Sequence, residues 1–485
     1  MQLSINIFII ASISLIMTGC SMNPEYQRPD NKEFTGDTFT QAKNETFNQE
    51  LDAIQWWQRF DDPTLNKLVE QALTNNIDLR VAAANVLETE ALIRSARGAR
   101  LPQINTAASS DRAFTGTSTG SSFAPGAGRT YFTTNQLVGQ VSWQADLFGR
   151  LRSTQQAAIA DWQASKTDRI ALTHTVIANV IQQRAELAIA INRLHVAQDI
   201  LTSREHTLEI VNRRYQQGVS NTSAVDIRLA RENVYAASAN ITALEQNLSL
   251  TQHALDILLG ARPGAFFIAD NDLINLPELN DSLVGIPAQL VDRRPDIRAA
   301  EFRTIAANAR VGVAVADLYP DLTITGALGW RDSEPSGLFS PRTLFGNIMG
   351  QLAHAAFTGG QRSAEAKAAR ARLEAAAHTY AGIVLQAIRE VEDALIQNHK
   401  LNEQLSILKQ RATEARLAER TSRDRYARGV EDLLTVLETE RRRQDAEDDL
   451  LQVELDYWNA RVNLFLALGG DWLSEENYTI ANTTP

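Results

Sequence analysis

The sequence predicts an α+β chain built from two copies of one unit, each copy with a β-hairpin and very long helices. Three observations predict this fold class. Only 25 glycines and 13 prolines occur in 485 residues, so the chain favours long regular elements. The same landmarks recur in the same order in both halves, which indicates an internal repeat. Two stretches alternate between apolar and polar residues, which is the period of a β-strand.

The repeat is visible in pairs of residues that share one spacing. The first pairs are 218 positions apart and the later pairs 211, which places a seven-residue deletion in a loop between them. The pairs are Asp78 with Asp296, Pro102 with Pro320, Gly149 with Gly360, and Gly218 with Gly429. We therefore expect a signal peptide at 1–19, an N-terminal arm at 20–61, copies at 62–260 and 290–469, a linker at 261–289 and a tail at 470–485.

Each copy is expected to begin with a helix, from about Asp62 to Arg100 and from about Pro295 to Leu318. The longest helices should lie between the paired glycines. Gly149 and Gly218 are 69 positions apart, which would span about 100 Å at the rise of an α-helix. Apolar residues on these helices repeat in alternating steps of four and three, which predicts left-handed coiled-coil pairing. By themselves, the helices fit an ordinary coiled-coil rod equally well.

The strands favour a barrel over a rod. We expect strands at about 101–113, 133–148, 318–331 and 344–357. The loop within the first hairpin is rich in Gly, Ser and Thr, and the loop within the second contains Pro335, Gly337 and Pro341. One apolar and one polar face fit a sheet against a core, or a membrane β-barrel with a wet interior. Four strands cannot close a membrane barrel, so the barrel must be shared. Three chains would supply about 12 strands and a water-filled lumen, whereas two would supply about 8.

The only cysteine, Cys20, ends an apolar N-terminal stretch in Leu15-Ile16-Met17-Thr18-Gly19-Cys20. This order resembles a bacterial lipobox, which implies that Cys20 carries a covalent lipid after removal of residues 1–19. The alternative is a plain signal peptide that ends near a cysteine. A single cysteine also excludes an internal disulfide and a multi-thiolate zinc site.

The composition and the missing sequence motifs predict that the protein is not an enzyme. The net charge is −11 and no basic run occurs, which excludes a typical nucleic-acid binder. The seven histidines lack metal-ligand spacing, and no phosphate loop or nucleophile elbow is present. The carboxylates at 447–449 are expected on a solvated helix face, and Trp56 and Trp57 are expected to pack the N-terminal arm against the helices. We expect no enzyme activity and no cofactor.

Several motifs together resemble the outer-membrane factor family of tripartite efflux systems, the TolC-like and OprM-like channels, in its lipoprotein branch. They are Cys20, the tryptophan-led segment 57–68, Asn76-x-Asp78-Leu79, the segment Arg293–Glu301, Phe357-x-Gly359-Gly360, and the Tyr-x-x-Gly turns at 215–218 and 426–429. The resemblance implies a homotrimer with a 12-stranded β-barrel in the outer membrane and an α-helical barrel in the periplasm. It also implies a passive exit duct for drugs or other small molecules. Its partners would be a periplasmic adaptor and an inner-membrane transporter of the resistance-nodulation-division class.

The resemblance also implies a periplasmic gate just after the second Tyr-x-x-Gly turn. Leu434 would form an apolar ring and Glu438 an acidic ring, with Asp226 as a weaker candidate from the first copy. The turns themselves would contact the adaptor through Tyr215, Gly218, Val219, Tyr426, Gly429 and Val430. Alternatively, Leu434 is an ordinary residue of the coiled-coil core and Glu438 lies on a solvated helix face.

Two other functions compete with the channel. One is a periplasmic coiled-coil lipoprotein without a pore that tethers envelope layers. The other is a lipoprotein hydrolase, which the missing catalytic motifs disfavour.

Overall fold

The computed structural model describes residues 22, 24–29, 56–60, 62–116, 129–219, 222–265 and 294–469. Cys20, the tail at 470–485 and most of the linker at 261–289 lie outside these residues. The described residues form two compact units. Unit 1 lies within Met1–Pro29, Asn85–Ser165 and Ala299–Tyr380, and unit 2 lies within Asp30–Ala84, Lys166–Arg298 and Ala381–Pro485.

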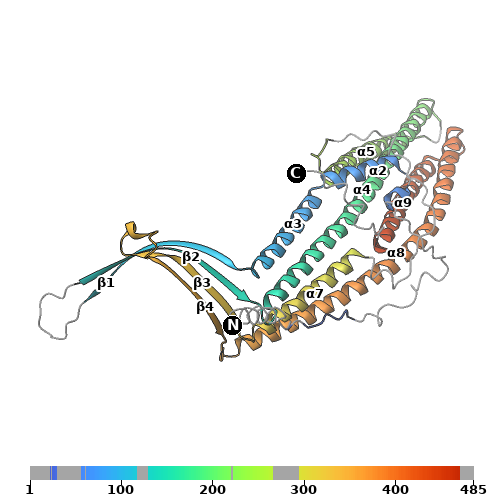
Figure 1. Cartoon of the computed structure of the whole chain (residues 1–485). Coiled ribbons are helices and arrows are strands. Elements are labelled where there is room, and N and C mark those ends of the chain that lie inside the picture. Colours follow the sequence, from blue (N-terminus) through green and yellow to red (C-terminus); the bar gives the residue numbers. More distant parts are fainter. Residues whose placement is uncertain are drawn as a thin grey trace. The chain divides into compact units, whose positions relative to one another are not determined.

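Unit 1 contains one four-stranded antiparallel sheet in the order β1-β2-β3-β4 (Figure 1). Its strands are β1 (Gln103–Gly116), β2 (Arg129–Ala145), β3 (Asp321–Asp332) and β4 (Leu344–Ala353). The two expected hairpins are therefore confirmed. The hairpins join through pairing of β2 with β3, where Trp143 lies opposite Ile324. One sheet thus combines both copies of the repeat.

Two strands end earlier than the sequence suggested. β2 stops at Ala145 rather than near 148, because the Asp146 carboxylate accepts hydrogen bonds from the backbone N–H groups of Leu151 and Arg152 at the start of the next helix. β4 stops at Ala353 rather than near 357. Its last partner on β3 is Asp321, and the residue before Asp321 is a proline, which has no N–H to continue the ladder.

The two faces of the sheet differ in polarity, as the alternation predicted. Because side chains alternate along each strand and the registers are known, each face can be assigned. One face is largely apolar in the region bounded by Trp143 and Trp330. Its large apolar residues are Trp143, Val141, Leu137, Ile324, Leu328, Trp330, Ile348, Leu344 and Ile104. The other face carries Gln103, Asn105, Gln140, Ser142, Gln144, Thr323, Thr325 and Gln351.

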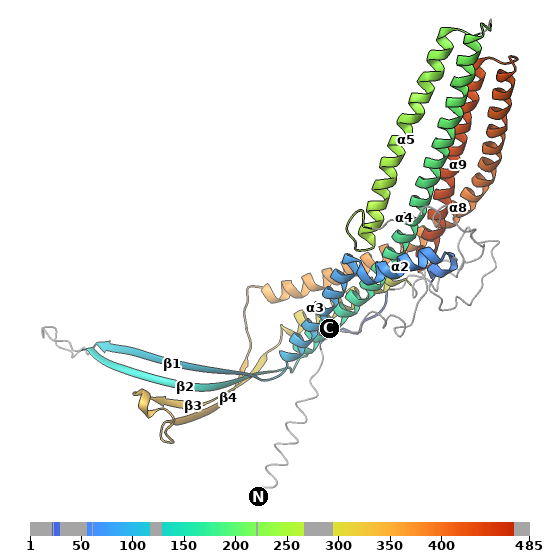
Figure 2. The same ribbon diagram turned by 90° about the horizontal axis from the view of Figure 1, so that it is seen from above.

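The long helices have the same lengths in both copies. α4 (Arg150–Gln216) and α8 (Gln361–Ala427) have 67 residues each, and α5 (Ala224–Leu258) and α9 (Leu433–Ala467) have 35 each. In unit 2 these four helices lie side by side (Figures 1 and 2). α7 (Pro295–Ala316) opens the second copy. None of the described helices combines the length and the hydropathy that crossing a bilayer requires.

The heptad seam is confirmed on α8. Tyr380, Val384, Ala387 and Val391 are buried. The positions that continue the steps of three and four are buried or half-buried: Ala394, Asn398, Leu401, Leu405, Leu408, Ala412 and Ala415. Steps of four and three keep one stripe of a helix facing its neighbour. Coiled-coil pairing therefore operates within a single chain.

The first helix is not continuous, contrary to expectation. It is divided into α2 (Pro63–Asn75) and α3 (Ile77–Gly98). Asn76 has φ −56° and ψ 130°, its side-chain oxygen accepts from the Leu79 N–H, and its amide group donates to the Leu258 carbonyl at 2.9 Å. Asn76 thus caps the start of α3 and at the same time hydrogen-bonds the end of α5. Its extended backbone separates α2 from α3.

Aromatic packing secures the segment before α2, as expected for Trp56 and Trp57. Both indoles are buried in unit 2. The Trp56 ring stacks on Phe465 with centroids 5.6 Å apart, and Phe60 stacks on Trp458 at 5.1 Å. The short 3₁₀ helix Trp56–Phe60 is therefore held on α9.

Candidate functional site

Two turns at one end of the four-helix part of unit 2 have the same geometry. Gly218 and Gly429 both have positive φ, 68° and 82°. The Val219 N–H bonds the Arg214 carbonyl, and the Val430 N–H bonds the Arg425 carbonyl, each at 3.1 Å. This six-residue closure around a left-handed residue is the Schellman motif, and glycine adopts that conformation without strain. We call the two turns the tip turns.

Replacing Gly429 by alanine is expected to weaken the end of α8, because a Cβ in the left-handed region costs about 1 kcal/mol. Hydrogen exchange of the last turn of α8 should then become roughly fivefold faster. Gly382 provides the control. It lies within α8 at ordinary φ with nothing within 4 Å of an added Cβ, so Gly382→Ala should leave exchange unchanged or slow it. Equal effects of the two substitutions would contradict the assignment.

A single arginine ties one tip turn to the other. The Arg214 guanidinium donates to the Tyr426 carbonyl at 2.5 Å and lies 4.4 Å from the centroid of the Tyr426 ring. Tyr426 is consequently 2% exposed, whereas Tyr215 in the first copy is 47% exposed. Burial raises the pKa of Tyr426, so its hydroxyl stays neutral at physiological pH. The two Tyr-x-x-Gly turns therefore have the same backbone geometry, but their tyrosines differ in burial and contacts.

Leu434 does not belong to the core of the chain. It is 66% exposed, while its neighbours Leu433 and Val436 are buried in a cluster with Tyr426. The interpretation of Leu434 as ordinary coiled-coil core is therefore wrong for the single chain. The apolar side chain of Leu434 is therefore accessible on the surface of the chain.

Glu438 is more closely paired than an acidic ring would suggest. Its carboxylate accepts hydrogen bonds from Arg441 at 3.0 Å and from Arg442 at 2.7 Å. The hydrogen bond from Arg441, followed by that from Arg442, lowers the pKa of Glu438 to about 2. Both arginines follow at i+3 and i+4, the spacing of helix ion pairs, which was a signal in the sequence. Glu438 stays ionised, but its charge is compensated locally.

Asp226 acts first as a helix cap. Its carboxylate accepts from the Ser223 N–H at 2.7 Å and from the Ser223 hydroxyl at 3.1 Å, which stabilises the start of α5. Asp432 plays the corresponding part for α9 by accepting from the Thr435 N–H at 2.7 Å. The acidic residues near the tip turns thus fix where the return helices begin.

A buried polar layer lies between α4, α8 and α9, and sequence reasoning missed it. Glu419 accepts from the Ser203 hydroxyl and pairs with Arg423, both at 2.9 Å. Glu440 accepts from the Thr207 hydroxyl at 2.8 Å, and burial raises its pKa. A comparison of the two copies at the 211-residue offset could have revealed this layer. The first copy has Leu208 and Leu229 where the second has Glu419 and Glu440, so the two glutamates stand at positions typical of core residues.

The carboxylates at 447–449 correct another expectation. Asp448 and Asp449 are exposed, but Glu447 is 2% exposed and bonds Arg416 at 2.5 Å and Arg443 at 3.1 Å. Glu447 therefore belongs to the buried polar layer rather than to a solvated face. Among the described residues, no group of three or more histidine, cysteine or acidic side chains is placed to hold a metal ion.

The segment after Cys20 is seated on unit 1. The Met22 N–H bonds the Phe148 carbonyl just past β2, and the Asn308 amide on α7 donates to the Pro24 carbonyl at 2.8 Å. Arg28 then pairs with Glu301 on α7 and donates to the Tyr380 hydroxyl on α8, both at 3.2 Å. Residues 24–29 thus link α7 to α8.

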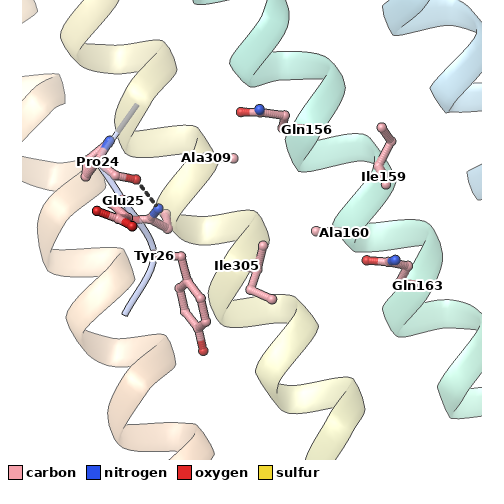
Figure 3. A pocket seen from close by; sticks show the side chains of 10 residues that line it. Pro24, Glu25, Tyr26, Gln156, Ile159, Ala160, Gln163, Ile305 and Ala309 are labelled. Atoms are coloured by element: carbon pink, nitrogen blue, oxygen red, sulfur yellow. Dashed lines mark hydrogen bonds between the residues drawn. The ribbon is translucent and has the colours of Figure 1, made fainter. Parts of the chain in front are cut away.

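A cavity of about 390 Å³ lies beside this segment. Figure 3 shows it between Tyr26 on the segment, Ile305 on α7, and Gln156 and Gln163 on α4. Burial, and then the charge of Glu301, raise the pKa of Tyr26 to about 12. The Tyr26 hydroxyl is therefore neutral.

Comparison with known proteins covers nearly the whole chain. The family model described as outer membrane efflux protein matches residues 68–261 and 286–470. The toluene efflux pump outer membrane protein TtgF of Pseudomonas putida is 31% identical, over 98% of this chain and 99% of its own length. OprJ of Pseudomonas aeruginosa is also 31% identical, over 95% of each. The solved outer-membrane channel OprN has a TM-score of 0.84 at 30% identity, covering 93% of this chain and 100% of its own.

Proposed function

Because the chain belongs to the outer membrane efflux protein family and is an outer-membrane efflux channel, we propose that three copies of it form the exit duct of a tripartite efflux system. The observation that carries the proposal is the incomplete sheet. Within the described residues, β1 and β4 each pair with one strand, so both present a free edge. The unpaired N–H and C=O groups of such an edge can pair with a strand of another chain.

Three copies fit the faces of the sheet. Twelve strands leave room for water inside, whereas eight leave an interior that side chains nearly fill. The face with Gln140, Ser142 and Gln144 would line the water-filled lumen, and the apolar face would contact lipid.

Counting subunits tests the proposal. Native mass spectrometry of the detergent-extracted protein is expected to give three chains, and planar bilayers are expected to show stepwise ion conductance. A monomer without conductance would favour the pore-less tether instead. A dimer that conducts ions would support the channel function but contradict the assembly of three chains.

The chain would work as a passive conduit that catalyses no reaction. An inner-membrane transporter of the resistance-nodulation-division class would supply the energy, and a periplasmic adaptor would dock on the tip turns. The exposed side chains of Tyr215 and Val430 offer apolar contacts for that adaptor. Since TtgF is named for toluene efflux, small apolar molecules belong to the proposed cargo.

Cys20 is proposed to carry the lipid that anchors the chain in the outer membrane. Mass spectrometry of the mature N-terminal peptide should find Cys20 as its first residue with added acyl mass. Cys20→Ser should abolish that mass and leave an uncleaved precursor. An unmodified peptide that starts elsewhere would favour the plain signal peptide.

The exposed Leu434 and the neighbouring Glu438 are proposed to narrow the periplasmic mouth. Three leucines at an axis can close a pore by excluding water, so Leu434→Ala should raise single-channel conductance several-fold. Adding Glu438→Ala should change cation selectivity only modestly, because Arg441 and Arg442 already compensate this charge. Leu385→Ala, an exposed leucine on α8, is the control. Conductance equal to the parent in the double variant would contradict this gate.

A further inference from the structure

The apolar face of the sheet contains a groove. It has a volume of about 770 Å³, within the range of small-molecule sites. Gly139 on β2 and Gly326 on β3 lie in it, and Val141, Leu328 and Ile348 border it. The registers explain its shape. Gly326 lies between Val141 and Ile348, and Gly139 lies opposite Leu328, so each glycine is flanked by a large apolar side chain.

No described part of the chain requires glycine at these two positions. A Cβ added to Gly139 would come no closer than 3.7 Å to the Leu328 carbonyl, and one added to Gly326 would meet its nearest atom at 3.7 Å. Neither residue has positive φ. Gly329 is different, because its Cβ would lie 2.2 Å from the Leu137 carbonyl. Glycine weakens a strand interior and often marks a place where a ligand approaches the backbone.

We propose that this groove, on the outward face of the barrel, binds one acyl chain of a membrane phospholipid. The proposal rests on the outer-membrane position of the sheet. Apart from Thr325 and Asn347, the residues that line the groove are apolar or glycine, which suits a hydrocarbon chain and offers no charged partner. It lies toward the helical end of the sheet, since Pro102 and Trp143 also line it and α4 begins shortly after β2.

Trp143 marks where the headgroup would lie. Its indole N–H donates to the Arg100 carbonyl at 3.0 Å, just before β1 begins. Tryptophan with an anchored N–H is typical of the membrane–water interface. A lipid chain entering beside Trp143 would come from the inner leaflet, whose lipids are phospholipids.

Other occupants fit the groove less well. β2 and β3 are the central strands and are paired on both sides, so a neighbouring copy would meet β1 and β4 instead. Exported cargo would travel along the polar face, where Gln140, Ser142 and Gln144 lie.

Photo-crosslinking tests the proposal. The full oligomer is placed in vesicles of phosphatidylethanolamine and phosphatidylglycerol that contain a phospholipid with a diazirine in the middle of one chain. After illumination, mass spectrometry should find label concentrated on Val141, Leu328 and Ile348. Ile104 and Leu352 are exposed on the same face outside the groove and should carry several-fold less. Even labelling of the face, or labelling of the polar face, would overturn the proposal.

Filling the groove gives the second arm. Gly326→Val should lower labelling of Leu328 and Ile348 at least fivefold, while Thr323→Val, on the opposite face and outside the groove, should leave it unchanged. Valine favours strands, so the oligomer should keep its heat stability, with Gly139→Val as a second filling variant. Labelling that persists in both glycine variants would overturn the site. Conductance is measured on the same samples, so a failed channel and a failed lipid site give different results.

Discussion

Replacing Arg184 by methionine is expected to detach α2 from the helices of unit 2. Arg184 is 2% exposed and lies 3.0 Å from the Asp62 carboxylate, which also caps α2 by accepting from the Thr64 and Leu65 N–H groups. Removing one partner leaves the other charge buried, which costs about 3 kcal/mol or more. Hydrogen exchange of residues 63–75 should therefore become roughly a hundredfold faster, measured on the intact oligomer.

Two further variants separate charge from packing. Adding Asp62→Asn to Arg184→Met removes the stranded carboxylate and keeps a residue that caps helices well, so most of the protection should return. Arg372→Met breaks an exposed pair with Glu365, 2.7 Å apart, and should change exchange less than threefold, because exposed pairs contribute little. If residues 63–75 exchanged as fast in the double variant as in Arg184→Met, lost packing rather than the buried charge would explain the faster exchange.

The repeat allowed much of this fold to be predicted. The glycine pairs 211 residues apart set the ends of α4 and α8, and the period of two identified both hairpins. These signals are local: a left-handed turn needs glycine, and a half-buried strand needs alternation. The break at Asn76 was missed because its partner, the Leu258 carbonyl, is 182 residues away. No window around Asn76 contains that hydrogen bond.

The candidate site was predicted less completely than the fold. Leu434 proved exposed, but the arginines that neutralise Glu438 were overlooked although they follow at helical spacing. The buried polar layer required a comparison of the copies, since only the second has glutamates at 419 and 440. The difference between Tyr215 and Tyr426 depends on which way Arg214 turns, and no pattern in the sequence fixes that.

Arg214 should decide how firmly the tip turns are held together. Arg214→Leu removes a hydrogen bond from a charged donor to the Tyr426 carbonyl and a cation–π contact with its ring. Charged hydrogen bonds contribute about 1.5 to 3 kcal/mol, and 1.4 kcal/mol is a factor of about ten in an equilibrium. If the tie holds the mouth closed, the open probability in planar bilayers should rise by about ten- to a hundredfold.

The repeat supplies the matched control for this prediction. Arg425 stands 211 residues after Arg214, at the same position of the second tip turn, but it is more exposed and pairs with Glu431 at 3.1 Å across its own turn. Arg425→Leu removes the same side chain from the same position of a tip turn, but it breaks no contact between the two turns. The open probability should therefore change less than threefold. Because both variants lose one positive charge near the mouth, a purely electrostatic effect on ion flow would appear in both. Opening that is equal in the two variants would show that the contact between the turns does not restrain the mouth.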